Sequence, residues 1–289
     1  MLNVLISLII AIQLINPLQG VVLGVSNIDS EFPRRMITNS FQPLLDSTSA
    51  FVLDMKTGKI LFQKNGYEQR SIASITKLMT AVVFVENNSD WNKNIRILDD
   101  DKLNGGKIVL LPGEIVNLGY LFKATLISSL NNGAMALARS SDLTPEEFIV
   151  RMNSKAVELG MRDSHFVDPS GISSLNQATA MDVAILLREA LNHELIREAL
   201  VTQRYSFDVM GGKRYTVTNT NELLGSYLDI VGGKTGYTDE AGFCLANLVR
   251  SERAPDGIVV VILGAASKEQ RFQENKFLSQ WVFDNWEWE

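Results

Sequence analysis

Cysteine and histidine are the residues that this 289-residue chain has least of. Cys244 is the single cysteine, which excludes an internal disulfide framework and a cysteine-based metal cluster. His165 and His193 are the two histidines, so little material is left for a histidine metal site. A Ser-His-Asp triad would have to use one of them, and nothing in their surroundings singles either out.

The chain also lacks a run of basic residues. It has 27 Lys and Arg against 33 Asp and Glu, and its formal net charge is -6. A nucleic-acid surface needs a local excess of positive charge, so we expect no nucleic-acid partner. The apolar fraction of 46% and the charged fraction of 21% are those of an ordinary folded protein. The length allows one large domain or two small ones.

The N-terminal apolar run, Leu2 to Ile15, ends at Asn16-Pro17. It is short for a membrane span, which needs about 20 apolar residues, and it resembles the hydrophobic region of an export signal. No Lys or Arg precedes the run and no Ala-x-Ala site follows it, so cleavage and retention as a membrane anchor both stay open. A buried N-terminal helix is the less favoured alternative. We predict a signal peptide or anchor over residues 1–22, a lead-in linker over 23–48, and an exported protein on the periplasmic or extracellular face of the cytoplasmic membrane.

The apolar pattern then changes twice along the chain. Strand-like runs at 50–54 and 59–63 flank a turn and predict a β-hairpin. From 72 to about 199 the pattern is helical, and afterwards it returns to strands. We expect strands at 204–208, 214–218, 227–231, 242–250 and 257–264, and helices at 72–87, 118–140, 145–159, from 179, at 194–200 and at 270–286. This predicts an α+β fold whose antiparallel sheet is flanked by helices and combines the first hairpin with the C-terminal strands, with an inserted all-helical subdomain at about 72–200.

A possible nucleophile and base occur together at Ser74 and Lys77, at the start of the first predicted helix, where Ser71 or Ser74 could serve as the cap. Residues three apart on a helix lie on one face. A serine hydroxyl needs a neighbouring base, and a lysine can serve if its pKa is lowered enough to leave it neutral. Alone, the Ser-x-x-Lys pattern is also typical of a capped amphipathic helix with a solvated lysine.

Two further motifs each occur twice. Lys56-Thr57-Gly58 lies in the predicted hairpin turn, whereas Lys234-Thr235-Gly236 lies in a glycine-dense strand region, where Gly236 would let a ligand backbone approach closely. Ser174-Leu175-Asn176 lies in a polar loop, whereas Ser129-Leu130-Asn131 lies in the helical insert and could face a cleft. We therefore expect the copies at Lys234 and Ser129 to be the functional ones.

Ser-x-x-Lys, Ser-x-Asn and Lys-Thr-Gly, in this order, are the signature of penicillin-binding proteins and serine β-lactamases. The chain resembles the D-alanyl-D-alanine carboxypeptidases among them, the low-molecular-weight penicillin-binding proteins. The similarity extends to the blocks 159–161, 166–171, 219–224 and 233–242, and to Gly264 and Arg271, and it covers about residues 49 to 286. It implies a penicillin-binding serine peptidase domain over 49–289, with the β-lactamase/transpeptidase-like fold and the site between the sheet and the helical subdomain.

The resemblance also implies roles for individual residues. Ser74 would be the acylated nucleophile, Lys77 its base, and Ser129 would help to complete the proton relay. The N–H groups of Ser74 and Tyr237 would form the oxyanion hole, and no metal or cofactor would be needed. The implied substrate-binding residues are Asn131, Lys234, Thr235, Gly236, Tyr237 and Arg271.

Several activities can use such residues. A carboxypeptidase that removes the terminal D-Ala of peptidoglycan stem peptides leads, with β-lactam antibiotics as covalent inhibitors. A D,D-endopeptidase that cuts cross-links would use the same residues. A serine β-lactamase is less favoured because the Glu-x-x-Leu-Asn motif of class A enzymes does not occur. A non-catalytic β-lactam sensor or wall-binding protein is disfavoured because every catalytic position is filled.

Overall fold

A five-stranded antiparallel sheet organises the fold. In the computed structural model of this chain, residues 32–36, 41–101 and 110–289 are described. The strand order is β10-β11-β12-β2-β3, so the first hairpin and the C-terminal strands share one sheet, as predicted. Its strands are β2 (Ser49–Asp54), β3 (Ile60–Lys64), β10 (Asp229–Thr238), β11 (Gly242–Ser251) and β12 (Ala254–Ala265).

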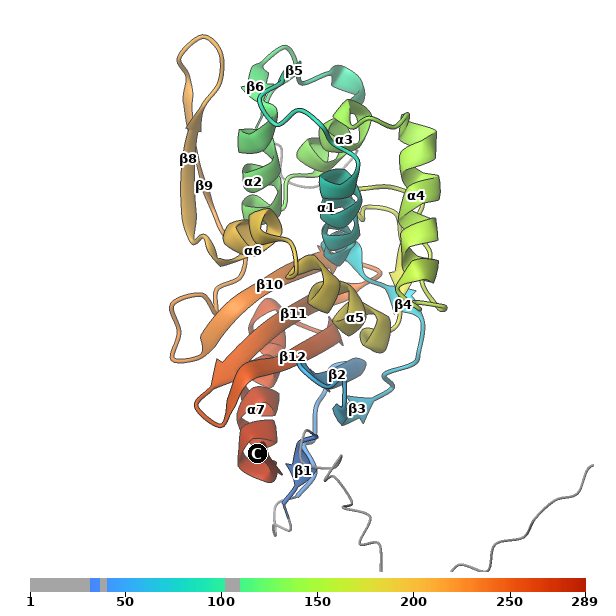
Figure 1. Cartoon of the computed structure of the whole chain (residues 1–289), viewed down its shortest axis with the longest axis vertical. Coiled ribbons are helices and arrows are strands. Elements are labelled where there is room, and N and C mark those ends of the chain that lie inside the picture. Colours follow the sequence, from blue (N-terminus) through green and yellow to red (C-terminus); the bar gives the residue numbers. More distant parts are fainter. Residues whose placement is uncertain (1–31, 37–40, 102–109) are drawn as a thin grey trace, which may run out of the picture.

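Helices cover both faces of this sheet (Figure 1). Helix α7 (Lys268–Asn285) packs against β12 and β11, and helix α5 (Ala180–Ala190) packs on the other side against β12, β2 and β11. The apolar run of β12 is buried on both sides, because alternate side chains of a strand point to opposite faces. Val259 and Val261 join the core that contains α1 and α5, while Val260 and Ile262 join the core under α7. The predicted α+β architecture is confirmed.

The first predicted helix, 72–87, is in fact two elements. A 3₁₀ turn, η2 (Ala73–Thr76), precedes α1 (Lys77–Glu86). The predicted serine cap is wrong, since Ile72 and Thr76 hold the two N-cap positions and neither makes a side-chain cap hydrogen bond. The cause is local backbone geometry: Ala73 has φ 48°, in the left-handed region, which interrupts a regular helical start.

The predicted helix over 118–140 is also divided. Ser129, with φ 59°, ends α2 (Leu118–Ser128), and α3 (Asn131–Ser140) starts after Leu130. By contrast, α4 (Pro145–Glu158) begins as predicted, with a capping box between Thr144 and Glu147. The insert also holds α6 (Glu194–Val201) and the short elements β5 (Asn94–Arg96), η3 (Asp99–Asp101), β6 (Ile115–Asn117) and β7 (Gln177–Ala178). The last of these, β7, pairs with β4 (Arg70–Ser71), which directly precedes the insert.

Strands β8 (Arg204–Asp208) and β9 (Arg214–Thr218) have the predicted bounds. They form a separate hairpin outside the main sheet, at the upper left of Figure 1. The predicted strand at 227–231 is wrong in extent, because β10 runs from Asp229 to Thr238 and takes the second Lys-Thr-Gly into the strand itself.

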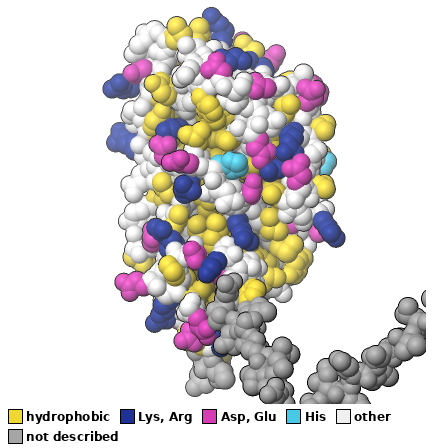
Figure 2. Space-filling model, in the orientation of Figure 1, with side chains coloured by type: hydrophobic (Ala, Val, Ile, Leu, Met, Phe, Trp, Pro, Cys, Tyr) yellow, Lys and Arg dark blue, Asp and Glu magenta, His cyan; other side chains and the backbone are white. Residues whose placement is uncertain are grey.

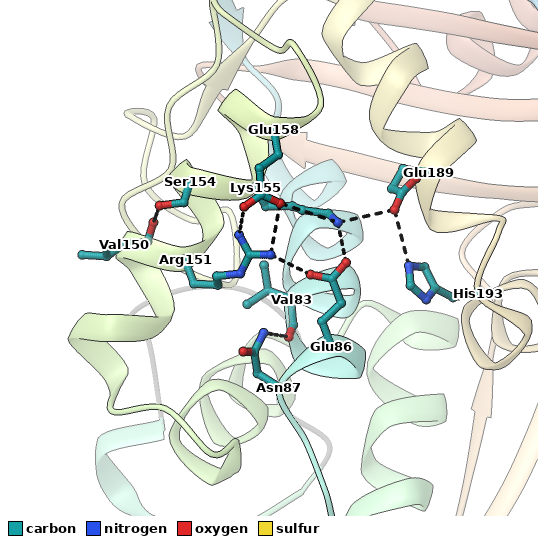
Figure 3. Close-up of polar contacts among 10 residues, drawn as sticks. All are labelled: Val83, Glu86, Asn87, Val150, Arg151, Ser154, Lys155, Glu158, Glu189 and His193. Atoms are coloured by element: carbon teal, nitrogen blue, oxygen red, sulfur yellow. Dashed lines mark hydrogen bonds and ion pairs between the residues drawn. The ribbon is translucent and has the colours of Figure 1, made fainter.

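An ion-pair network joins three helices of the insert (Figure 3). The ammonium of Lys155 on α4 bonds to the Glu86 carboxylate at the end of α1 and lies 3.5 Å from Glu189 on α5. Arg151 adds a 3.0 Å contact to Glu86. Glu86, Glu189 and His193 could each offer a metal-ligand atom. The Lys155 ammonium lies between the two carboxylates, and Arg151 adds a second positive charge at Glu86, so the group acts as an internal ion-pair network between helices.

The predicted lead-in segment is partly docked on the domain. Within its described part, β1 (Arg34–Arg35) pairs with β13 (Trp286–Glu287), and the N–H groups of Asp46 and Ser47 donate to Glu274 on α7.

The predicted signal or anchor over 1–22 lies outside the described residues. Among the residues that are described, no helix is long and apolar enough to cross a membrane. On the face drawn in Figure 2, basic and acidic side chains are interspersed.

Candidate active site

The structure brings Ser74 and Lys77 into direct contact. Lys77 Nζ lies 2.9 Å from Ser74 Oγ, because Ser74 lies in the 3₁₀ turn η2 that directly precedes Lys77, the first residue of α1. The Lys77 side chain is fully buried. Its ammonium also donates to Asn131 Oδ1 at 2.7 Å and to the carbonyl of Ser170 at 2.5 Å. Three segments that are distant in sequence therefore converge on one amine.

Burial lowers the pKa of Lys77 to about 7, and the nearby charge of Asp168 opposes that shift in part. An amine that leaves water loses the solvation of its charged form, so the neutral form is favoured. With a pKa of about 7, Lys77 is neutral about half of the time at neutral pH. It can therefore accept a proton from the serine that it contacts.

Ser129 and Asn131 flank the junction between α2 and α3. Ser129 is half-buried at the left-handed C-cap of α2, and Asn131 begins α3 and reaches Lys77. In the other Ser-x-Asn copy, Ser174 is exposed, and the Asn176 side chain donates to Asp168. That copy therefore shapes a loop, whereas the copy at Ser129 reaches the buried amine.

The two Lys-Thr-Gly copies lie in different surroundings. At the first, Thr57 donates to Asp54 at 2.6 Å and Gly58 has φ 73°, as expected in a hairpin turn. The second lies on β10, the edge strand beside η2. A Cβ on Gly236 would lie 2.8 Å from the Ile72 carbonyl oxygen and 3.2 Å from the Ser74 nitrogen. Glycine is thus what lets the strand approach the serine so closely.

The second copy places a further buried cation in the site. Lys234 is 1% exposed, and its Nζ donates to the Thr235 carbonyl at 3.1 Å. Burial, with smaller contributions from the charges of Lys77 and Arg271, holds the pKa of Lys234 well below its usual range. A negative ligand group would relieve this repulsion. The Thr235 hydroxyl lies 2.6 Å from the Thr220 hydroxyl, which fixes its position on the strand.

The side chains of Tyr237, on β10, and Arg271, on α7, both contact the ring of Phe243. Tyr237 is half-exposed, its ring stacks on Phe243 with centroids 4.2 Å apart, and its hydroxyl donates to Asp239. Arg271, on α7, is 6% exposed and donates to the carbonyl of Gly236 at 3.0 Å. The guanidinium of Arg271 therefore holds the backbone of β10 at Gly236. Burial lowers the pKa of this guanidinium.

Sequence reasoning assigned no role to the loop that holds Lys77. Asp168 accepts hydrogen bonds from the N–H groups of Ser170, Gly171 and Ser173, from the Ser170 hydroxyl and from Asn176. Burial alone would raise the pKa of Asp168, but these donors lower it. The loop thereby directs the Ser170 carbonyl at Lys77. The sequence signal that could have indicated this loop was the similarity of residues 166–171 to the family. That similarity alone assigned no role to any side chain in the loop.

Comparison with known proteins shows which family this chain resembles. A family model described as D-alanyl-D-alanine carboxypeptidase, peptidase S11, matches residues 36–267. The D-alanyl-D-alanine carboxypeptidase DacF of Bacillus subtilis is 29% identical over 84% of this chain, which spans 63% of that relative's length. The D-alanyl-D-alanine endopeptidase of Escherichia coli is 33% identical over 85% of this chain and 80% of its own length.

Solved structures show the same architecture. A DD-transpeptidase of Streptomyces matches with a TM-score of 0.78 and 26% identity, covering 85% of this chain and all of that one. A penicillin-binding protein of Listeria monocytogenes, in its cefotaxime-bound form, matches with a TM-score of 0.72 and 26% identity, covering 84% of this chain and all of that one. The predicted transpeptidase-like fold is confirmed. The chain belongs to the peptidase S11 family of serine D,D-peptidases.

Proposed function

We propose that this protein is a D-Ala-D-Ala carboxypeptidase that trims peptidoglycan stem peptides through an acyl-enzyme on Ser74. The observation that carries the proposal is the contact of 2.9 Å between Ser74 Oγ and the buried amine of Lys77, whose pKa is about 7. A nucleophile and a base that is partly neutral at working pH are the two parts that serine acylation requires.

In the proposed reaction, Ser74 Oγ attacks the carbonyl carbon of the penultimate D-Ala while its proton passes to Lys77. The N–H groups of Ser74 and Tyr237 stabilise the oxyanion of the tetrahedral intermediate. The carbon–nitrogen bond breaks, and the departing amine of the terminal D-Ala receives a proton through the relay that includes Ser129. Water then hydrolyses the acyl-enzyme and restores Ser74.

The buried cation of the second Lys-Thr-Gly suits the substrate's free carboxylate. Lys234 and Thr235 bind that carboxylate in the proposed complex, Gly236 leaves room for the peptide backbone, and Asn131 holds the acyl side. Arg271 contributes positive charge from behind the strand, through its contact with the Gly236 carbonyl. No step of this scheme requires a metal or a cofactor.

A D,D-endopeptidase that cuts cross-links is the second candidate. The observation that favours it is sequence identity: the endopeptidases of Escherichia coli and Haemophilus influenzae are 33% identical to this chain, and the Bacillus carboxypeptidase is 29% identical. Both activities use the same nucleophile and base, so the distinction lies in how the amine side of the substrate is bound.

One experiment separates these activities from inert binding. Purified protein is incubated with cross-linked and uncross-linked muropeptides, and the products are identified by mass spectrometry. Release of D-alanine from pentapeptides supports a carboxypeptidase, and conversion of dimers to monomers supports an endopeptidase. A Ser74→Ala variant should release neither, and Ser174→Ala should act like the unmodified protein. If neither substrate is converted, both catalytic proposals fail.

We also propose that β-lactam antibiotics acylate Ser74, since they present a reactive carbonyl next to a carboxylate. The cefotaxime-bound form of the Listeria relative supports this expectation. A fluorescent penicillin should label the unmodified protein and Ser174→Ala but not Ser74→Ala. Equal labelling of Ser74→Ala would refute the assignment of the nucleophile.

A further inference from the structure

A cavity of about 370 Å³ adjoins the candidate active site at the end of β10. Tyr237 and the acidic residues Asp239 and Glu240 form one part of its lining, and Arg70 forms another. Arg70 begins the segment that leads directly into the 3₁₀ turn with Ser74. The cavity therefore lies next to the residues that would hold the reacting carbonyl. We call it the Arg70 cavity.

Within the residues that the structure describes, Arg70 is a positive side chain without a counter-ion. It is half-buried, and its Nε atom is buried without a hydrogen-bond partner. Among the described parts of the chain, no hydrogen bond or ion pair engages its guanidinium. A cation withdrawn from water without a partner is costly, so such a side chain points to an anionic ligand. Arginine matches a carboxylate particularly well, because two parallel N–H donors face its two oxygens.

The fold makes room for this guanidinium. Gly264 on β12 has φ 71°, and a Cβ there would lie 2.4 Å from Arg70 Nη2. The position thus requires glycine both for its backbone conformation and for the space that Arg70 occupies. The tight fit against β12 holds the arginine at the cavity wall. The acidic side chains Asp239 and Glu240, both exposed, line the same cavity and could accept an ammonium group.

The proposed substrate orientation leads to this cavity. With the terminal carboxylate at Lys234 and Thr235 and the scissile carbonyl at the Tyr237 N–H, the peptide runs antiparallel to the edge strand β10. Each further residue towards its N-terminus advances about 3.4 Å towards Thr238 and Asp239. The third residue of the stem peptide therefore reaches the Arg70 cavity.

We propose that the Arg70 cavity is a subsite for the third residue of the stem peptide, and that Arg70 binds a carboxylate at the end of that residue's side chain. The inference rests on the proposed function, which supplies the peptide and its direction. The substrate it selects carries a diamino acid whose side chain ends in both an ammonium and a carboxylate, as in diaminopimelate. Lysine at that position supplies only the ammonium.

Binding to a Ser74→Ala protein tests the subsite separately from catalysis. Two pentapeptides that differ only in the third residue, diaminopimelate or lysine, are titrated by NMR. The diaminopimelate peptide should bind about 10-fold or more tightly than the lysine peptide, the range of a charge-assisted bidentate pair. Adding Arg70→Gln should bring the two dissociation constants to within about twofold of each other, mainly because the diaminopimelate peptide binds more weakly.

Two further variants separate the role of Arg70 from a general effect on structure. Arg70→Lys keeps the charge but loses the paired donors, so it should retain only part of the preference. Arg204→Gln, on the distant β8–β9 hairpin, should leave the preference unchanged. Circular dichroism verifies that each variant is folded. The same substitutions made in protein that retains Ser74 are checked by penicillin labelling.

Equal affinity for the two peptides, no binding of either, or a parallel loss of both in Arg70→Gln would overturn the inference. D-alanine release by the unmodified protein is measured independently. If the diaminopimelate peptide binds more tightly in a way that depends on Arg70, but the unmodified protein neither releases D-alanine nor cleaves cross-links, the proposed function is refuted and the subsite stands. If D-alanine is released but the two peptides bind equally, the subsite is refuted and the proposed function stands.

Discussion

At the scale of single residues, the proposed role of Lys77 as a base depends on how its surroundings change its proton affinity. Sequence reasoning predicted that burial and proximity to Lys234 would lower its pKa, and it found no acid within one helical turn. Burial does lower the pKa to about 7, but Asp168, from a distant loop, raises it in part. The acid that matters is therefore a tertiary neighbour.

The pH dependence of acylation should follow Lys77. Its neutral form increases as pH rises through about 7, so the rate of penicillin acylation should increase over that range and then level off. In Asp168→Asn, the charge that raises the pKa of Lys77 is lost, so the midpoint should move to lower pH. The maximal rate should also fall, because the loop hydrogen bonds are disturbed. Stopped-flow labelling at several pH values measures both, and an unchanged or higher midpoint would contradict the account.

Replacing Lys77 by arginine tests whether it acts as a base. Arginine keeps the positive charge and approximate reach but stays protonated in proteins. We expect Lys77→Arg to lower the acylation rate by at least about 100-fold, the scale of general-base catalysis. Circular dichroism should show a folded protein. Near-native acylation would mean that Lys77 supplies only charge and that another group takes the proton.

At the scale of elements, β10 decides which Lys-Thr-Gly copy can contact a ligand. Lys234→Ala should reduce penicillin acylation by about 10- to 100-fold, because a charge-assisted contact to the ligand carboxylate is lost. Lys56→Ala, in the exposed hairpin turn, should change it by less than about twofold, as surface substitutions usually do. Labelling rates of the two variants give the comparison, and the reverse order would refute the choice of copy.

The ion-pair network of α1, α4 and α5 should contribute to stability. Lys155 is buried between Glu86 and Glu189, so Lys155→Met would leave two carboxylates without their central cation. We expect a loss of about 2–3 kcal/mol in the free energy of unfolding. The matched variant is Lys123→Met, which removes a more exposed pair with Glu198 and should cost less than about 1 kcal/mol. Urea denaturation measures the free energy of unfolding of both variants. Equal losses in Lys155→Met and Lys123→Met would show that the network stabilises the protein no more than an exposed ion pair does.

At the scale of the whole molecule, we propose from the wall substrate and the apolar start of the chain that the protein acts outside the cytoplasmic membrane. We expect cell fractionation to recover the protein in the exported or membrane-associated fraction. Removal of residues 1–22 should leave it in the cytosol, still able to react with penicillin after purification, because those residues precede the described domain. Full-length protein in the cytosol, with an intact N-terminus and no membrane association, would contradict this localisation.

The sequence by itself determined the elements whose signals are local. The bounds of β8 and β9 and the start of α4 follow from short-range alternation and from Thr144, Pro145 and Glu147. The motif order also identified Ser74 and Lys77 as partners, because three residues of helical chain bring two side chains together. Such features depend on a few neighbouring residues, so they can be predicted without knowing the fold.

Only the tertiary structure decided what surrounds those residues. Segments that are distant in the chain set the left-handed backbone at Ala73 and Ser129 and bring the Ser170 carbonyl to Lys77. They also place the guanidinium of Arg70 beside Gly264. The pKa of Lys77 depends on them as well, since desolvation is a property of everything packed around a group rather than of its own sequence. The motif therefore supplied the groups that we propose to react, and the packing of remote segments lowered the pKa of Lys77 far enough for its proposed role as the base.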